Sequence, residues 1–231
     1  MWKKLQGFNQ HDSDQWLLAS SLISILLVPF AVTFSILLYP DYPANENLSS
    51  LGARSPAFSN VTKQYVQPIY PELFNIPIII AALGLMALPI LRQRKLRTKL
   101  PNWVLTLMNL LQTCAFVFLF LLGIFDLGFI RYVHDRVAQY FFYLIMAMFL
   151  LFGISLTIYR ERIYQRWRLM LGITIYLFLI SIQRQLSMWK VITDPYYLSN
   201  GPYQKLWGVG WILLTLVEIE GLFSLNHKEL D

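Results

Sequence analysis

Two glutamates near the C-terminus are the first candidates for a chemical role. Glu218 and Glu220 lie inside the apolar stretch 206–225, where an ionisable side chain is costly unless it has a function or a partner. Because they are two residues apart, a helix points them roughly 200° from each other, which excludes a paired-carboxylate site. We favour one buried, hydrogen-bonded glutamate and one interfacial glutamate. A proton or cation pathway is the alternative.

An arginine and an aspartate form a second candidate pair. Arg184 lies about one turn from the end of the apolar stretch 169–188, by the helical period, and Asp126 follows the stretch 103–125. Both are at a matching depth, so we expect an ion pair between them. Arginine also suits bidentate binding of a lipid phosphate, which is the alternative use of Arg184.

The elements that position these residues are expected to be membrane-spanning helices. The chain is 56% hydrophobic and 14% charged, against roughly 25% charged residues in soluble domains. The net charge of +6 comes from short basic clusters between apolar runs, a pattern typical of membrane topology rather than of nucleic-acid binding. Cys114 is the single cysteine, which excludes an intrachain disulfide and a cysteine metal site.

The sequence predicts an all-α polytopic membrane bundle of six transmembrane helices in a single domain, 1–231. Crossing the hydrocarbon takes about 20 mostly apolar residues. The first apolar run is too long for a signal-peptide core, and we interpret it as a retained span. The expected spans are 16–38, 73–91, 103–125, 137–159, 169–188 and 206–225.

The distribution of Lys and Arg predicts the orientation. Twelve of these residues lie on the side of the termini and six on the other side, counted outside the spans. Both termini are therefore expected to be cytoplasmic. The basic cluster at residues 92–99 is interpreted as an inward loop that contacts anionic headgroups. The loop 39–72 and two shorter ones then face outward.

A polar site is expected at the outward face. His134 can act as a general base, a metal ligand or a pH sensor, and Ser49 and Asp126 lie on the same side. A Ser-His-Asp arrangement is permitted without being indicated, and the enzyme class stays open. His11 and His227 lie on the opposite side, so neither a metal nor a cofactor is expected. The candidate headgroup site comprises Ser49, Arg54, Asp126, His134 and Arg184.

The outward loop carries a motif that resembles a known family. Its residues are Leu48, Ser49, Ser50, Leu51, Gly52 and Pro56, followed by Phe74-Asn75, and later by His134 with Phe141 and Phe142. The layout resembles the DRAM-like, FGF-receptor-activating-protein family, and its uncharacterised bacterial and archaeal relatives more closely. Ser50 replaces an acidic residue of that motif. The resemblance implies an association with membrane lipids. We expect Gly52 to permit a tight turn.

Three functions remain open. The first is a protein that binds or handles a membrane lipid at its outward face. The second is a small ion- or proton-coupled transporter that uses Glu218. The third is a non-catalytic accessory subunit whose membrane-protein partner docks on the phenylalanine-rich runs 116–125 and 141–152. Asn47 and Asn60 begin glycosylation patterns in the outward loop, which would matter only in a secretory membrane.

Overall fold

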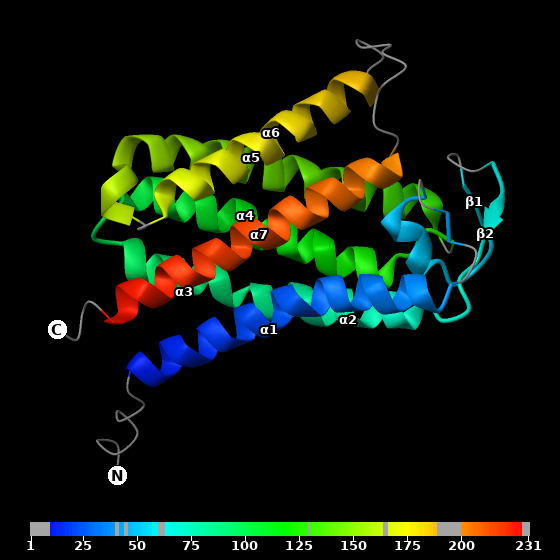
Figure 1. Cartoon of the computed structure of the whole chain (residues 1–231), viewed down its shortest axis with the longest axis horizontal. Coiled ribbons are helices and arrows are strands. Elements are labelled where there is room, and N and C mark those ends of the chain that lie inside the picture. Colours follow the sequence, from blue (N-terminus) through cyan, green and yellow to red (C-terminus); the bar gives the residue numbers. More distant parts are fainter. Residues whose placement is uncertain are drawn as a thin grey trace.

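Long helices dominate the structure. The computed structural model describes residues 10–39, 42–43, 46–59, 63–128, 130–163, 166–188 and 200–227. Met86 alone separates α2 from α3, and the two continue as one apolar segment. Figure 1 shows the helices packed beside one another in a bundle. The helices are α1 (Gln10–Leu37), α2 (Glu72–Leu85), α3 (Ala87–Leu96), α4 (Asn102–Ile124), α5 (Arg131–Ile163), α6 (Trp167–Met188) and α7 (Asn200–His227).

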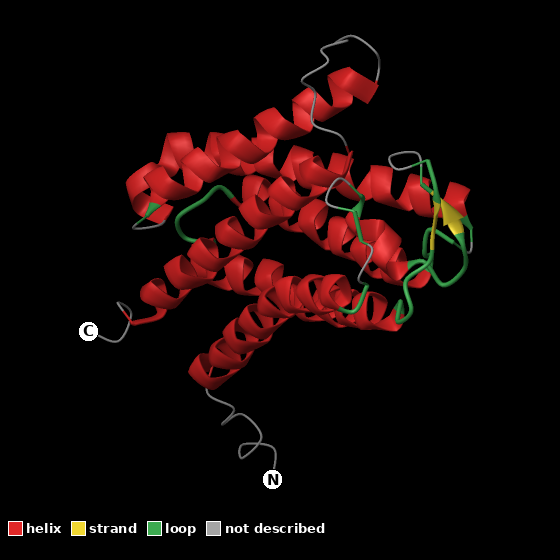
Figure 2. Ribbon diagram, turned by 45° about the vertical axis from the view of Figure 1, so that its right-hand side comes forward, coloured by secondary structure: helices red, strands yellow, loops and turns green. Residues whose placement is uncertain are grey.

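The two ends of the bundle differ. α1 begins and α7 ends at one end, here called the terminal end (Figure 1). The opposite end, called the cap end, carries the short helix η2 (Leu48–Gly52) and the strands β1 (Ala57–Phe58) and β2 (Tyr65–Val66). The strands pair antiparallel, and Figure 2 shows them at the edge of the helical layer. This hairpin is the departure from the expected all-α fold within the described residues.

Several helices are suited to a membrane. Large apolar side chains such as Ile23 and Phe30 project from the outer face of α1, which suits contact with lipid rather than water. The expected fifth span, 169–188, corresponds to a shorter apolar segment, Trp167–Gln183 of α6. These features indicate an integral membrane protein. Among the residues that the structure describes, five segments are long and apolar enough to cross a bilayer: Asp12–Leu37, Glu72–Leu96, Asn102–Ile124, Arg131–Tyr159 and Gly201–Leu225.

Part of the basic cluster at residues 92–99 is helical and not a loop, which corrects the sequence interpretation. The helix continues past the expected end at residue 91 as far as Leu96, so Arg92 and Lys95 are helical. Both side chains are buried. Burial of a charge is tolerated when an opposite charge compensates it, and Glu218 and Asp14 provide those charges. These two residues are therefore not available to anionic headgroups.

An aromatic cluster joins α4, α5 and α7. Phe116 lies 6.4 Å from Trp211, and Phe141 lies 5.8 Å from Trp207, measured between ring centroids. The Phe141–Trp207 contact is edge-on, a geometry that aromatic pairs favour. Phe116, Phe141 and Phe149 are buried. These phenylalanines pack inside the bundle, which removes them from the surface that a docking partner was expected to use.

Small residues bring α1 and α2 close together. The Ser20 hydroxyl lies 3.4 Å from the backbone oxygen of Gly84. A methyl group added at Gly84 would overlap the Ser24 hydroxyl. Close approach through Gly and Ser is a common way for helices to associate in a membrane. Gly84 therefore sets the distance between these two helices.

Helix α6 lies at one side of the bundle (Figure 1). It packs along α5 and α7, and both views show it leaning away from the remaining helices toward its Met188 end (Figures 1 and 2). The Trp207 indole donates a hydrogen bond to Ser181 at 3.2 Å and ties α7 to α6. This arrangement leaves space along the α6–α7 seam.

Candidate functional site

Four ionisable side chains form a cluster at the cap end, here called the cap cluster: Arg54, Glu72, Asp126 and His134. Arg54 lies between two carboxylates. Its Nε and Nη2 donate to Glu72 at 2.5 and 3.0 Å, and its Nη1 donates to Asp126 at 3.1 Å. The hydrogen bonds to Glu72 raise the pKa of Arg54 above its ordinary value, so the guanidinium stays charged. The loop is thereby fastened to the ends of α2 and α4.

Asp126 organises the turn between α4 and α5. Its side chain is 1% exposed, and Oδ1 accepts hydrogen bonds from the backbone N–H groups of Arg54 and Gly128 at 3.1 and 2.8 Å. His134 Nδ1 lies 2.7 Å from the backbone oxygen of Phe125. Because a carbonyl oxygen only accepts, Nδ1 carries the proton. His134 therefore helps to hold this turn.

A second set of contacts stabilises the loop internally and joins it to α7. The buried Glu46 accepts a hydrogen bond from the Ser59 hydroxyl at 2.5 Å. The Tyr42 hydroxyl donates to the Glu46 backbone oxygen at 2.9 Å. Burial and the nearby Glu46 carboxylate raise the pKa of Tyr42, so its phenol remains a neutral donor. The Leu48 N–H donates to Gln204 of α7 at 2.9 Å.

A buried ion pair lies on the terminal-end side of the bundle. Arg92 Nε and Nη2 donate to the two carboxylate oxygens of Glu218 at 2.6 and 2.9 Å. The side chains are 0% and 4% exposed. Arg92 Nη1 also donates to Asn109 at 3.1 Å, and the guanidinium lies 5.7 Å from the ring centroid of Phe152. This bidentate pair joins α3 to α7, with α4 and α5 around it.

Three further ion pairs lie at the terminal end. The buried Asp14 of α1 contacts Arg94 and Lys95 of α3, both at 2.9 Å. Arg166 contacts Glu220 of α7 at 2.9 Å, and these two side chains are 60% and 51% exposed. Together with Arg92–Glu218, the pairs connect α1 to α3, α3 to α7, and α7 to the start of α6. Among them, the Arg166–Glu220 pair is the one with both side chains exposed.

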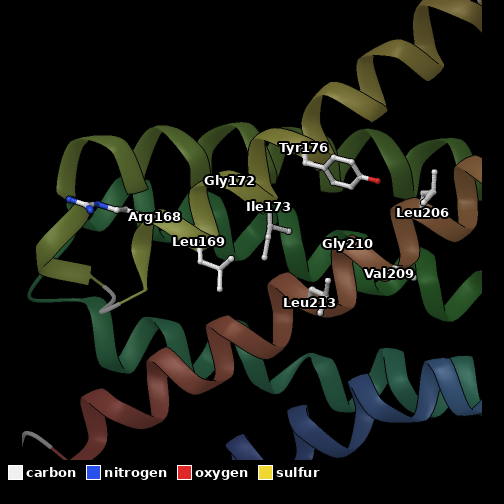
Figure 3. A pocket seen from close by; sticks show the side chains of 9 residues that line it. All are labelled: Arg168, Leu169, Gly172, Ile173, Tyr176, Leu206, Val209, Gly210 and Leu213. Atoms are coloured by element: carbon white, nitrogen blue, oxygen red, sulfur yellow. The ribbon is translucent and has the colours of Figure 1, made fainter.

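An apolar groove of about 490 Å³ runs between α6 and α7, here called the α6–α7 groove. Figure 3 shows Leu169 and Ile173 directed toward α7, with Arg168 at the end farthest from Leu206. A methyl group added at Gly172 would meet nothing within 4 Å, so the missing side chain widens the groove. The lining residues are Arg168, Leu169, Gly172, Ile173, Tyr176, Leu206, Val209, Gly210 and Leu213.

The structure brings some of the predicted site residues together and separates others. Arg54, Asp126 and His134 meet in the cap cluster. Ser49 lies half-buried in η2, and no described contact brings its hydroxyl to His134. The side chain of Arg184 lies outside the described residues, so its expected pair with Asp126 stays a prediction, and among the described residues Asp126 pairs with Arg54. Glu218 and Glu220, which point in different directions on α7, contact Arg92 and Arg166 respectively.

Sequence reasoning missed Arg92 as a site residue. The signal was available, because no Pro or Gly breaks the helical pattern between Pro89 and Leu96. One further turn of helix carries Arg92 into the bundle. Sequence reasoning also missed the contact that Gly52 makes. The φ angle of Gly52 is not positive, so its backbone conformation does not require glycine, but a methyl group there would overlap Asn75. Gly52 is thus required by close packing with α2, where Asn75 donates to its backbone oxygen at 2.8 Å.

Metal binding finds no support in the part of the chain that the structure describes. No group of three or more His, Cys, Asp or Glu side chains is suitably placed for a metal ion among those residues. Arg54 and Arg92, which are always protonated, occupy the centres of the cap cluster and of the buried ion pair with Glu218. Their chemistry is charge pairing and hydrogen bonding.

Comparison with known protein families gives one match. Residues 22–187 match the family described as protein of unknown function, DUF998. The matched stretch contains the cap cluster, Arg92 and the α6 side of the groove, and it ends before α7. No curated protein and no solved structure matches the chain. The chain belongs to the DUF998 family.

Proposed function

We propose that this chain is a six-span membrane protein that binds a membrane lipid, with one acyl chain lying in the α6–α7 groove. The observation that carries the proposal is the groove itself. Its volume of about 490 Å³ falls within the roughly 300–1,000 Å³ of small-molecule sites. Its lining is apolar apart from Arg168 and the hydroxyl of Tyr176.

The groove differs from an ordinary lipid-facing surface. Gly172 and Gly210 form part of its lining, so an acyl chain can approach the helix backbone closely. Inside a bilayer the hydrophobic effect does not favour the groove over surrounding lipid, because both are apolar. Shape and van der Waals contact decide the preference, and a groove offers more contact per methylene group than a convex helix face does.

The proposal places the terminal end on the cytoplasmic side. The bias of Lys and Arg toward this end supports that orientation. The even number of spans follows if α6 crosses the membrane beside α5 and α7. Arg168, at the terminal end of the groove, would then face the headgroups of the cytoplasmic leaflet.

A headgroup site at the cap end is the less favoured location. Arg54, its central cation, already binds Glu72 and Asp126, so a phosphate would have to displace two carboxylates. The resemblance of the Leu48–Pro56 element to the DRAM-like family supports an association with lipids in general. It does not indicate which part of the chain contacts them.

Transport through Glu218 is the second candidate. A chain of hydrogen bonds leads away from the buried pair: Asn109 donates to Gln93 at 2.8 Å, and Gln93 to Asn102 at 3.3 Å. However, Arg92 binds both Glu218 oxygens and keeps its proton under all ordinary conditions. Such a pair suits a fixed link between helices. Unchanged proton or cation flux into vesicles that contain the Glu218→Gln protein would remove this candidate.

Native mass spectrometry of the purified protein tests the groove. Gly172→Leu places a side chain in the groove, and we expect the variant to retain at least several-fold less co-purified phospholipid than the unaltered protein. Gly208→Leu is the matched control, because a side chain there also meets nothing within 4 Å and Gly208 does not line the groove. Equal lipid retention in both variants would contradict the proposal.

A further inference from the structure

Arg168 lines the terminal end of the α6–α7 groove, and the exposed Arg166–Glu220 ion pair lies at the same end of the bundle. We propose that Arg168, Arg166 and Glu220 form a headgroup site that selects an anionic glycerophospholipid over a zwitterionic one. This inference rests on the proposed function, because it concerns the headgroup of the lipid whose acyl chain lies in the groove. It assigns the phosphate to Arg168 and a regulating role to Glu220.

Arg168 is the cation best placed for a phosphate. Its side chain is exposed, lines the groove and lies 5.4 Å from the ring centroid of Trp167. Among the residues that the structure describes, no carboxylate lies within ion-pair distance of it. Contact with an aromatic face orients a guanidinium without neutralising its charge. The planar guanidinium can then bind two phosphate oxygens at once.

Arg166 is a second cation at this end, and it forms an ion pair with Glu220. Both side chains of their ion pair at 2.9 Å are exposed, and an exposed ion pair contributes little to stability. An incoming phosphate can therefore compete for Arg166 at little cost. The buried pair Arg92–Glu218 offers no such exchange, because both partners are shielded from solvent.

The charges at this end set the preferred lipid. Two arginines and one glutamate give a net charge of +1 from these side chains. A glycerophospholipid with one net negative charge complements that balance, whereas a zwitterionic lipid brings a cation toward two arginines. Removal of the Glu220 carboxylate leaves +2 and frees Arg166. The counterintuitive consequence is that loss of an acidic residue strengthens binding of an anionic lipid.

The experiment measures competitive retention of two lipids with identical acyl chains. The purified protein is exchanged into mixed micelles that contain equal amounts of dioleoyl phosphatidylglycerol and dioleoyl phosphatidylcholine, and the bound lipids are counted by native mass spectrometry. We expect the retained ratio to favour phosphatidylglycerol. Arg168→Gln should lower that ratio about fivefold, the effect of one basic residue near anionic lipid, and Glu220→Gln should raise it.

Two controls change the same charges elsewhere at the terminal end. Arg97→Gln and Asp12→Asn alter exposed residues that lie outside the groove lining, and the lipid ratio should stay unchanged in both. Arg168→Lys keeps the charge and should retain most of the preference. All of these positions are exposed, so the fold should tolerate the changes.

The outcomes separate this inference from the groove proposal. A ratio that Arg168→Gln leaves unchanged, while Gly172→Leu reduces retention of both lipids, would overturn the headgroup site alone. Retention that Gly172→Leu leaves unchanged would overturn the groove as well. A ratio that falls or stays unchanged in Glu220→Gln would contradict the role given to Glu220, because release of Arg166 should favour the anionic lipid.

Discussion

Replacement of Glu218 by glutamine is the sharpest test of the bundle interior. The change keeps the size of the side chain and removes one charge, so Arg92 remains buried with no counter-ion at Glu218. The charge centres of a bidentate pair lie roughly 4 Å apart, which gives about 4 kcal/mol at an effective dielectric constant of about 20. Loss of one partner of a buried pair costs about 3–5 kcal/mol in measured cases. The Coulomb energy and the measured range of destabilisation agree.

The assay is thermal unfolding of the purified protein. Intrinsic tryptophan fluorescence monitors the unfolding, because it changes as the buried core becomes exposed. For a protein of this size, 1 kcal/mol shifts Tm by roughly 2–4 °C, so we expect Glu218→Gln to lower Tm by about 6–20 °C. Glu220→Gln removes an exposed pair worth about 0–1 kcal/mol and should shift Tm by no more than about 4 °C.

A double variant separates lost charge balance from lost volume. Arg92→Met with Glu218→Met removes both charges and retains apolar bulk, and such replacements are neutral or stabilising by about 1–4 kcal/mol. We therefore expect its Tm to return to at least the value of the unaltered protein. The reasoning is refuted if Glu218→Gln unfolds within 2 °C of the unaltered protein, taken as roughly the change from less than 1 kcal/mol, or if the double variant is no more stable than the single one.

Two other predictions use the same assay. Asp126→Asn weakens charge-assisted hydrogen bonds to Arg54 and Gly128 and should lower the free energy of unfolding by about 1.5–3 kcal/mol. Asp135→Asn is an exposed control with a 3.8 Å ion pair and should lower it by less than about 1 kcal/mol. Equal losses of stability in the two variants would contradict the role of Asp126 in the turn. Gly84→Leu forces α1 and α2 apart at Ser24 and should cost about 1–3 kcal/mol or more; an unchanged Tm would show that the helices do not pack there.

The long helices are predictable because their apolar runs exceed what a soluble core needs. The expected span 103–125 agrees with α4 (Asn102–Ile124) to within one residue at each end, and the expected span 206–225 lies inside α7 (Asn200–His227). The ends of helices were harder to predict. A basic residue after an apolar run, such as Arg92, is equally compatible with a loop and with one more helical turn. Only the presence of a carboxylate on a distant helix decides between the two.

The polar contacts were less predictable than the helices. Glu218 and Asp126 were recognisable as residues that need partners, because both lie in or beside apolar stretches. Their partners were not, since Arg92 is 126 positions away from Glu218 and Arg54 is 72 positions away from Asp126. Sequence separation of this kind carries no signal in a single chain. The small residues followed the same rule, because Gly52 is explained by its contact with Asn75 and not by its own backbone.

The groove had no sequence signal at all. Gly172 and Gly210 are ordinary residues of apolar helices, and Arg168 is one of several basic residues near the membrane boundary. Their common position depends on the angle at which α6 and α7 meet. That angle is set by contacts such as Trp207 with Ser181, which no periodicity in the sequence predicts.

Photo-crosslinking with a phospholipid that carries a diazirine in its acyl chain tests the central claim most directly. The reagent labels any side chain that the acyl chain touches, and peptide mapping identifies the site. We predict adducts concentrated on Leu169, Ile173 and Leu213 and lost in Gly172→Leu. Labelling of these residues at the same frequency as exposed α1 residues such as Phe30 would show that the groove holds lipid no differently from the rest of the membrane surface, and would contradict the account.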